Sequence, residues 1–227
     1  MKNNSFRQHA HEFVDWIADY FENIEKYPVK SQVNPGDIKK LIPKSAPKHE
    51  EDMNDIFSDF QNIIMPGISH WQHPGWFAYF PANNSPASVL GEILTAGLGV
   101  QGMIWDTSPA ATELEEVVMN WLRDMIGLPA DFSGVIQDTA STATLCALLS
   151  AREKSSDFSI NEKGYQKTLR VYASSQTHSS IEKGVKISGF GRSNLVYIDT
   201  DRHFALKPDA LEAAIENYRG SGIEKKG

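Results

Sequence analysis

SGVIQDTASTATLCALLSAREK, residues 133–154, is the stretch that decides the fold. A short apolar run at 133–137 leads through small and hydroxyl residues into a helical pattern over 139–154. The same order returns twice, as LRVYAS then SSIEKGVKISG within 169–189, and as NLVYID then PDALEAAIENYRG within 194–220. Strands that alternate with helices are typical of a parallel sheet with crossover helices. The sequence therefore predicts an α/β fold over its second half.

The series ends at SGIEKKG, after a helix that would normally deliver the chain to another strand. We therefore expect this chain to be the front part of something longer.

The first half of the chain is mainly helical in pattern. Apolar residues recur at spacings of three and four from Phe6 to Ile24, which predicts an amphipathic arm that ends before Pro28. Residues 29–50 carry prolines and little periodicity, so extended chain is expected there. Further helices are predicted over Asp52–Met65, over 88–97, and from Thr112, where Thr112 to Glu115 has the form of a capping box.

Composition excludes several classes of protein. The 227 residues are 41% hydrophobic and carry a net charge of −7 without a basic stripe, so nucleic acid is not expected as a partner. Cys146 is the single cysteine, which excludes an intrachain disulfide and a thiolate metal cluster. The sequence shows no signal-peptide pattern and no apolar run of membrane-spanning length. We therefore expect a cytoplasmic protein.

Two apparent motifs, one for nucleotide binding and one for metal binding, are not supported by the sequence around them. Gly97 to Gly102 matches G-x-G-x-x-G, but a helix precedes it and no helix opens from it, so a glycine-rich turn is the better interpretation. The pairs His70/His73 and His9/His11 lack a third ligand at convincing spacing, so no metal is expected.

Small and hydroxyl residues at 137–144 lie where a predicted strand ends and a helix begins. Free backbone N–H groups at a helix start can hold a phosphate, and small side chains let it approach. Threonine and serine also cap helices that bind nothing, so the residues alone leave both interpretations open.

His178 follows the second predicted strand, at the carboxyl edge where open parallel sheets bind ligands. A lone histidine is more often structural or solvated. If the two strands are neighbours, however, the 137–144 turn and the imidazole would share one crevice.

An aromatic segment, HWQHPGWFAYFPANNSP at 70–86, places five large rings within ten positions among several prolines. Each such ring can bury about 150–250 Å², so burial of the cluster is favoured over its exposure to water. From the residues alone, a dry structural cluster and a slot for a flat ring both fit.

Four motifs together resemble the group II pyridoxal-phosphate-dependent amino acid decarboxylases, closest to the aromatic-L-amino-acid decarboxylases. They are IIMPGISHWQHPGWFAYFPANNSP, WDTSPAATELEEVVMNWL, GVIQDTASTATLCALLSAR and SSQTHSSIEKG, in family order over essentially the whole chain. By the usual length of such enzymes, the resemblance covers about the front half of a member.

The resemblance implies an incomplete PLP-dependent transferase fold of the aspartate aminotransferase-like type, fold type I. Residues 1–85 would be the helical arm and dimerisation segment, and 86–227 the front part of the cofactor-binding large domain. A homodimer with an amino acid substrate is implied, with no nucleic acid or membrane partner.

The resemblance also assigns site residues. Ala140 and Ser141 match positions that bind the cofactor phosphate, and His178 matches the histidine that stacks on the pyridine ring and is implicated in catalysis. Substrate-pocket positions are matched by Trp71, Tyr79, Phe80, Pro81, Ala82, Gln101 and Met103, the last two reaching into the neighbouring subunit's site.

The family's Schiff-base lysine has no counterpart here, because Lys183 and Lys186 fall on the helix after His178, and Lys225 and Lys226 resemble solvated charge. We therefore expect the 227 residues alone to be inactive. Ala82 stands where members often carry a hydroxyl residue, which leaves tryptophan, phenylalanine, tyrosine and dopa open as substrates. Oxidative deamination, a non-catalytic dimerisation module and a glutamate-type decarboxylase remain as alternatives.

Overall fold

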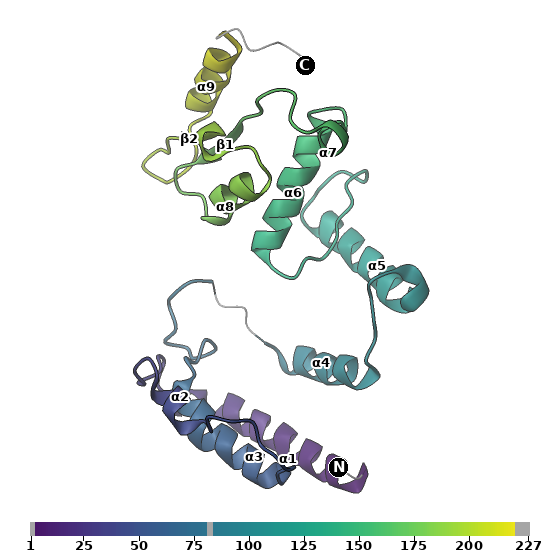
Figure 1. Ribbon diagram of the computed structural model, residues 1–227, viewed down its shortest axis with the longest axis vertical. Helices are drawn as coiled ribbons and strands as arrows, with labels where there is room; N and C mark the ends of the chain where they lie inside the picture. Colours follow the sequence, from purple (N-terminus) through teal and green to yellow (C-terminus); the bar gives the residue numbers. More distant parts are fainter. Residues whose placement is uncertain (1–2, 81–83, 221–227) are drawn as a thin grey trace. The chain divides into compact units, whose positions relative to one another are not determined.

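The computed structural model describes residues 3–80 and 84–220, and helices dominate both units into which the chain divides (Figure 1). The units are Met1–Val100 and Gln101–Gly227. Pro81 and Ala82, both predicted pocket residues, lie outside the described residues. In the part of the chain described, no helix has the length and apolar character needed to cross a membrane.

The first unit contains four α-helices among its described residues, with short irregular turns between them. Their bounds are α1 Asn3–Glu22, α2 Asp37–Leu41, α3 Met53–Asp59 and α4 Pro86–Leu98, joined by η1 Ile24–Lys26, the π-helical η2 Phe60–Ile64 and η3 Met65–Gly67. The predicted amphipathic arm and the predicted helix over 88–97 are thereby confirmed as α1 and α4. Gly99, with φ +61°, ends α4, as the glycine-rich turn predicted.

Aromatic packing joins α1 to α3, which lie side by side (Figure 1). The Phe13 and Phe57 rings are 4.6 Å apart between centroids, and Trp16 meets the edge of Phe60 at 5.2 Å. Phe13 belongs to the apolar stripe predicted for the arm, and Phe57 and Phe60 are apolar positions of the helix predicted over Asp52–Met65. The hydrophobic effect therefore docks the arm through that stripe.

The second unit holds a two-stranded parallel sheet and its helices. The elements are η4 Trp105–Thr107, α5 Pro109–Met125, α6 Ala140–Lys154, α7 Ile160–Lys163, β1 Val171–Ser174, α8 Ser180–Ile187, η5 Arg192–Asn194, β2 Leu195–Ile198 and α9 Pro208–Gly220. Val171 pairs with Leu195 and Ser174 with Ile198. Strand, helix, strand and helix thus follow one another from β1 to α9, as the sequence predicts.

The core of the second unit forms where the sheet meets α8. Ala173 and Leu195 from the strands pack with Val185 and Phe190, and Leu148 of α6 packs against this cluster. The α6 and α8 helices therefore share the core that the two strands supply.

The strand predicted at 133–137 is wrong. No strand forms there, and the backbone N–H of Ile136 donates instead to the Glu115 carboxylate at 2.7 Å. The Val135 and Ile136 side chains are mostly exposed. The apolar run predicted a strand, but a strand also needs a neighbour to pair with, and among the described residues this segment has none.

The start predicted for α5 is also wrong. The helix begins at Pro109, and the cap is Ser108, whose hydroxyl accepts from the Ala111 N–H at 3.4 Å. Proline at the first helical position has no N–H to leave unsatisfied. Thr112 therefore lies inside the helix, where its hydroxyl donates to the Ser108 carbonyl.

Extended chain was predicted over residues 29–50, but part of this segment is helical. Gly36 adopts φ +95°, and the Asp37 carboxylate accepts from the Asn34 N–H at 3.0 Å, so this turn starts the short α2. The helix predicted over Asp52–Met65 forms as α3 and continues as the π-helical η2. The 3-10-helical η3 follows, and Ile68 after it is extended.

Candidate active site

The start of α6 is capped by Thr139, which leaves its neighbours with free donors. Thr139 is extended, and its hydroxyl accepts from the Thr142 N–H at 3.2 Å. Within the described part of the chain, the N–H groups of Ala140 and Ser141 and the Ser141 hydroxyl have no hydrogen-bond partner. Both residues are exposed. This helix end can therefore cap itself and still offer donors to an anion.

His178 lies between β1 and α8, and its ring orientation is fixed by the residue that opens the helix. The Ser180 backbone N–H donates to the imidazole Nδ1 at 3.2 Å, and the Ser180 hydroxyl oxygen is 3.0 Å from the same nitrogen. A backbone N–H can only donate, so Nδ1 is the acceptor and the neutral ring carries its proton on Nε2. Ser180 is buried, whereas the His178 ring is exposed.

The α6 and α8 helices run in the same direction. Leu148 lies against Gly184, and Arg152 Nη1 donates to the Ser188 carbonyl at 3.0 Å, so later residues of one helix meet later residues of the other. Two helices packed in this order have their starting ends on the same side. Ser141 and His178 therefore belong to the same end of this helix pair.

The aromatic segment lies in the first unit. The Trp71 ring stacks on Trp76 at 5.0 Å and on Tyr79 at 5.7 Å with only 7° between the ring planes. The Tyr79 and Phe80 side chains are 80% and 99% exposed. Tyr79 also has φ +59°, a conformation that costs a residue with a side chain about 1–3 kcal/mol.

His70 anchors this segment to α1. Its side chain is only 1% exposed, and its Nδ1 is 2.8 Å from the Tyr20 hydroxyl. Burial, followed by the charge of His73, lowers the pKa of His70. Sequence reasoning considered His70 only as a metal ligand and missed this anchoring role. Among the described residues, no group of three or more His, Cys, Asp or Glu side chains could hold a metal ion.

Gln101 and Met103 begin the second unit. The Gln101 carbonyl accepts from the Thr107 hydroxyl at 2.8 Å, and the Met103 side chain is mostly exposed. Trp71, Tyr79 and Phe80 belong to the first unit. The predicted pocket residues are therefore divided between the two units.

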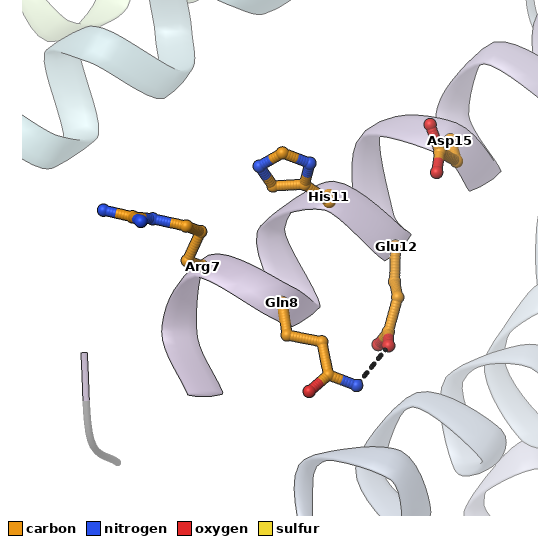
Figure 2. Close-up of a pocket in the computed structure, with 5 residues that line it drawn as sticks. All are labelled: Arg7, Gln8, His11, Glu12 and Asp15. Carbon is orange, nitrogen blue, oxygen red and sulfur yellow. Dashed lines mark hydrogen bonds between the residues drawn. The ribbon is translucent and has the colours of Figure 1, made fainter. Parts of the chain in front are cut away.

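Figure 2 shows a pocket on α1 that sequence reasoning did not predict. The Gln8 amide donates to the Glu12 carboxylate at 2.9 Å, and the bonds from Gln8 and His9 lower the pKa of Glu12. The lining residues are Arg7, Gln8, His11, Glu12 and Asp15. Every one of them comes from α1, and none is a predicted site residue.

Most of the chain matches one known protein family. The pyridoxal-dependent decarboxylase conserved domain matches residues 35–223. The chain belongs to this family. Its members use pyridoxal phosphate, and the fold is part of the fold type I architecture that the sequence predicted.

Individual relatives resemble nearly all of this chain. Tyrosine decarboxylase 2 of Narcissus pseudonarcissus is 44% identical over 98% of the chain and 46% of its own length. Phenylacetaldehyde synthase of Petunia hybrida is 46% identical over 96% of the chain and 44% of its own length. The crystal structure of Catharanthus roseus tryptophan decarboxylase in complex with L-tryptophan is 39% identical, with a TM-score of 0.89 over 98% of this chain and 48% of that one. The chain thus spans a little under half the length of these relatives.

The second unit fits the family cofactor. The free donors of Ala140 and Ser141 suit a phosphate group, and a flat imidazole with a fixed Nδ1 suits stacking on a pyridine ring. Both features lie at one end of the α6–α8 pair.

Proposed function

We propose that the complete polypeptide decarboxylates aromatic L-amino acids with pyridoxal phosphate, giving the amine and carbon dioxide. The observation that carries the proposal is the α6–α8 pair, with free anion donors and a fixed imidazole at one end. Family membership and relatives named as tyrosine and tryptophan decarboxylases support it.

In this proposal, the second unit holds the cofactor. The N–H groups of Ala140 and Ser141, with the Ser141 hydroxyl, bind the phosphate, and the positive end of the helix dipole adds to the attraction. His178 stacks on the ring, and Ser180 keeps the imidazole from turning. When bound, pyridoxal phosphate supplies an electron sink for the pair left by the departing carboxylate.

The substrate side chain would meet the aromatic segment. Trp71, Tyr79 and Phe80 present large exposed rings, which suit a flat apolar side chain better than an acidic one. By family resemblance, the proposal also assigns Pro81 and Ala82 to this pocket, and it assigns Gln101 and Met103 to the pocket of the neighbouring subunit. Because Ala82 has no hydroxyl, substrates without a ring hydroxyl, such as phenylalanine and tryptophan, are accepted alongside tyrosine and dopa.

Oxidative deamination is a second candidate function. The observation that favours it is the 46% identity with a phenylacetaldehyde synthase, a value similar to the 44% with tyrosine decarboxylase 2. Decarboxylation alone releases the amine and carbon dioxide, whereas the alternative also consumes oxygen and water and releases carbon dioxide, an aldehyde, ammonia and hydrogen peroxide. Product analysis therefore separates the two.

The proposal also covers the location and assembly of the protein, the roles of its two parts, and the activity of the 227 residues on their own. The complete protein is a cytoplasmic homodimer in which residues 1–85 serve dimerisation and 86–227 form the cofactor-binding part. The 227 residues alone do not decarboxylate, because Lys183 and Lys186 lie on α8 and the Lys186 amine is paired with Glu182 at 2.6 Å. Sedimentation of the complete protein tests the dimer.

The decisive experiment expresses the complete polypeptide and offers it tryptophan, tyrosine, phenylalanine, dopa and glutamate. We expect amine and carbon dioxide from the aromatic substrates and nothing from glutamate. Ser141→Ala should weaken cofactor binding about tenfold, because one hydrogen bond to a charged group is lost. Ser150→Ala, an exposed position on the same helix, is the matched control. Turnover of glutamate alone, or equal cofactor affinity in the Ser141→Ala and Ser150→Ala variants, would contradict the proposal.

A further inference from the structure

Arg152 joins α6 to α8 at the end opposite the proposed cofactor site. Its Nη1 donates to the Ser188 carbonyl at 3.0 Å, and the Tyr165 hydroxyl donates to the same oxygen at 2.7 Å. Ser188 is the residue that caps the end of α8, and it is 2% exposed. The last turn of α8 is therefore held by two partly buried side-chain donors.

The other N–H donors of Arg152 also have hydrogen-bond partners. Nε and Nη2 both donate to one Glu153 oxygen, at 3.1 and 2.9 Å, and Nη2 also donates to the Asn161 side-chain oxygen at 2.6 Å. The Asn161 N–H donates to the second Glu153 oxygen at 3.3 Å. The Arg152 and Glu153 side chains are only 13% and 10% exposed. Only a planar guanidinium can serve these partners at once, so lysine cannot replace it.

The α8 helix links the anchored Ser188 to the imidazole of His178. It has eight residues, Ser188 follows its last one, and Ser180, which binds His178 Nδ1, is its first. Gly184 lies against Leu148 between these ends and Val185 packs in the core beside it, so apolar packing holds the middle of the helix and the Ser188 carbonyl anchors its far end. Shifting the anchored end would tilt α8 about its packed middle and move the imidazole relative to Ser141.

We propose that Arg152 is a positioning residue, which sets the His178 ring over the cofactor by anchoring the far end of α8 to α6. The inference rests on the proposed function, since it concerns the same cofactor site. Arg152 itself lies at the opposite end of the helix pair and touches neither cofactor nor substrate. Tyr165 supports it through the shared Ser188 carbonyl, with the guanidinium 5.8 Å from the centre of its ring.

The test uses the complete holoenzyme with Arg152→Lys and, as a matched control, Arg123→Lys. Arg123 has the same local pattern: Nε and Nη2 donate to the carboxylate of the next residue, Asp124, and Nη1 donates to the Ala130 carbonyl. It lies on α5 and does not anchor α8. The measurements are kcat, KM, the visible circular dichroism of the bound cofactor, and the melting temperature.

We expect Arg152→Lys to lower kcat about tenfold with KM changed less than about twofold, because a small misplacement of a positioned group acts on the reacting geometry. The visible circular dichroism should weaken in parallel, since it reports the asymmetric surroundings of the cofactor ring. Arg123→Lys should match the wild type in kcat and circular dichroism. Tyr165→Phe, which removes one donor to Ser188 and keeps the ring, should shift both in the same direction by a smaller factor.

A lower melting temperature with unchanged kcat and circular dichroism in Arg152→Lys would overturn the inference, because it would show a stabilising role alone. If Arg152→Lys fails to fold, Tyr165→Phe decides in the same way. A wild-type protein that binds no pyridoxal phosphate would overturn the proposed function as well, and this is seen before any variant is compared.

Discussion

Removing the Tyr20 hydroxyl tests how the aromatic segment is held to α1. In the wild type, this hydroxyl is 2.8 Å from Nδ1 of His70, whose side chain is almost fully buried. Tyr20→Phe deletes one oxygen atom. The ring contacts of Tyr20 with Trp16 at 5.6 Å and with Tyr27 at 5.2 Å are kept. The substitution therefore isolates the hydrogen bond from the packing.

The expected loss follows from the burial of the partner. An imidazole nitrogen that is left without a partner and away from water costs about 1–3 kcal/mol. With a urea m-value of about 1–3 kcal/mol per M, the unfolding midpoint of the first unit should fall by roughly 1 M. Tryptophan fluorescence reports mainly on this unit, because it holds Trp16, Trp71 and Trp76, whereas Trp105 and Trp121 belong to the second unit and contribute a separate signal.

Tyr27→Phe is the matched control. The Tyr27 ring lies 4.8 Å from His70, but within the described residues its hydroxyl makes no hydrogen bond. Its removal should change stability by less than about 0.5 kcal/mol. Equal midpoints for Tyr20→Phe and the wild type would refute the anchoring role of the His70–Tyr20 pair. Equal losses in Tyr20→Phe and Tyr27→Phe would show that ring packing, and not the hydrogen bond, is measured.

Three further predictions concern single residues. Burial lowers the pKa of His70 from its ordinary 6.5, so the contribution of the neutral imidazole to stability is complete above pH 6.5 and is lost as the pH falls toward the lower pKa of the folded state. Urea titrations at several pH values should show this loss of stability in the wild type and a smaller loss in His70→Asn. Thr139→Ala should destabilise the second unit by about 1 kcal/mol through loss of the α6 cap, measured by thermal unfolding followed by circular dichroism, and an unchanged melting curve would contradict the cap. In α4, Gly91→Ala should stabilise the helix by about 0.5–1 kcal/mol, because the added methyl group meets open space, whereas Gly99→Ala at φ +61° should destabilise it; equal helicity in both variants would contradict this contrast.

The sequence was most informative where local pattern and tertiary structure agree. The periodicity of α1 and the alternation from β1 to α9 follow from burying one face of each element, which leaves a mark in every turn or every second residue. The start of α5 could also have been predicted, because Ser108 followed by Pro109 is a stronger start signal than Thr112.

Other features depend on partners far away in the chain. The apolar character of 133–137 says nothing about whether a neighbouring strand is present, which is why a strand was predicted there wrongly. Arg152 and Ser188 are 36 residues apart, and no local pattern connects them. At the candidate site, the free donors of Ala140 and Ser141 followed from their place at a helix start. The common direction of α6 and α8 required the structure.

The small sheet has a practical consequence for handling the isolated chain. In the described part of the chain, β1 and β2 pair only with each other, so the outer edge of each strand offers unused hydrogen-bonding groups. Val135 and Ile136 also expose β-branched side chains. Such edges recruit strands from other molecules and favour aggregation. Concentrated preparations should therefore self-associate, and a lysine in place of Ile136 should keep them in solution longer.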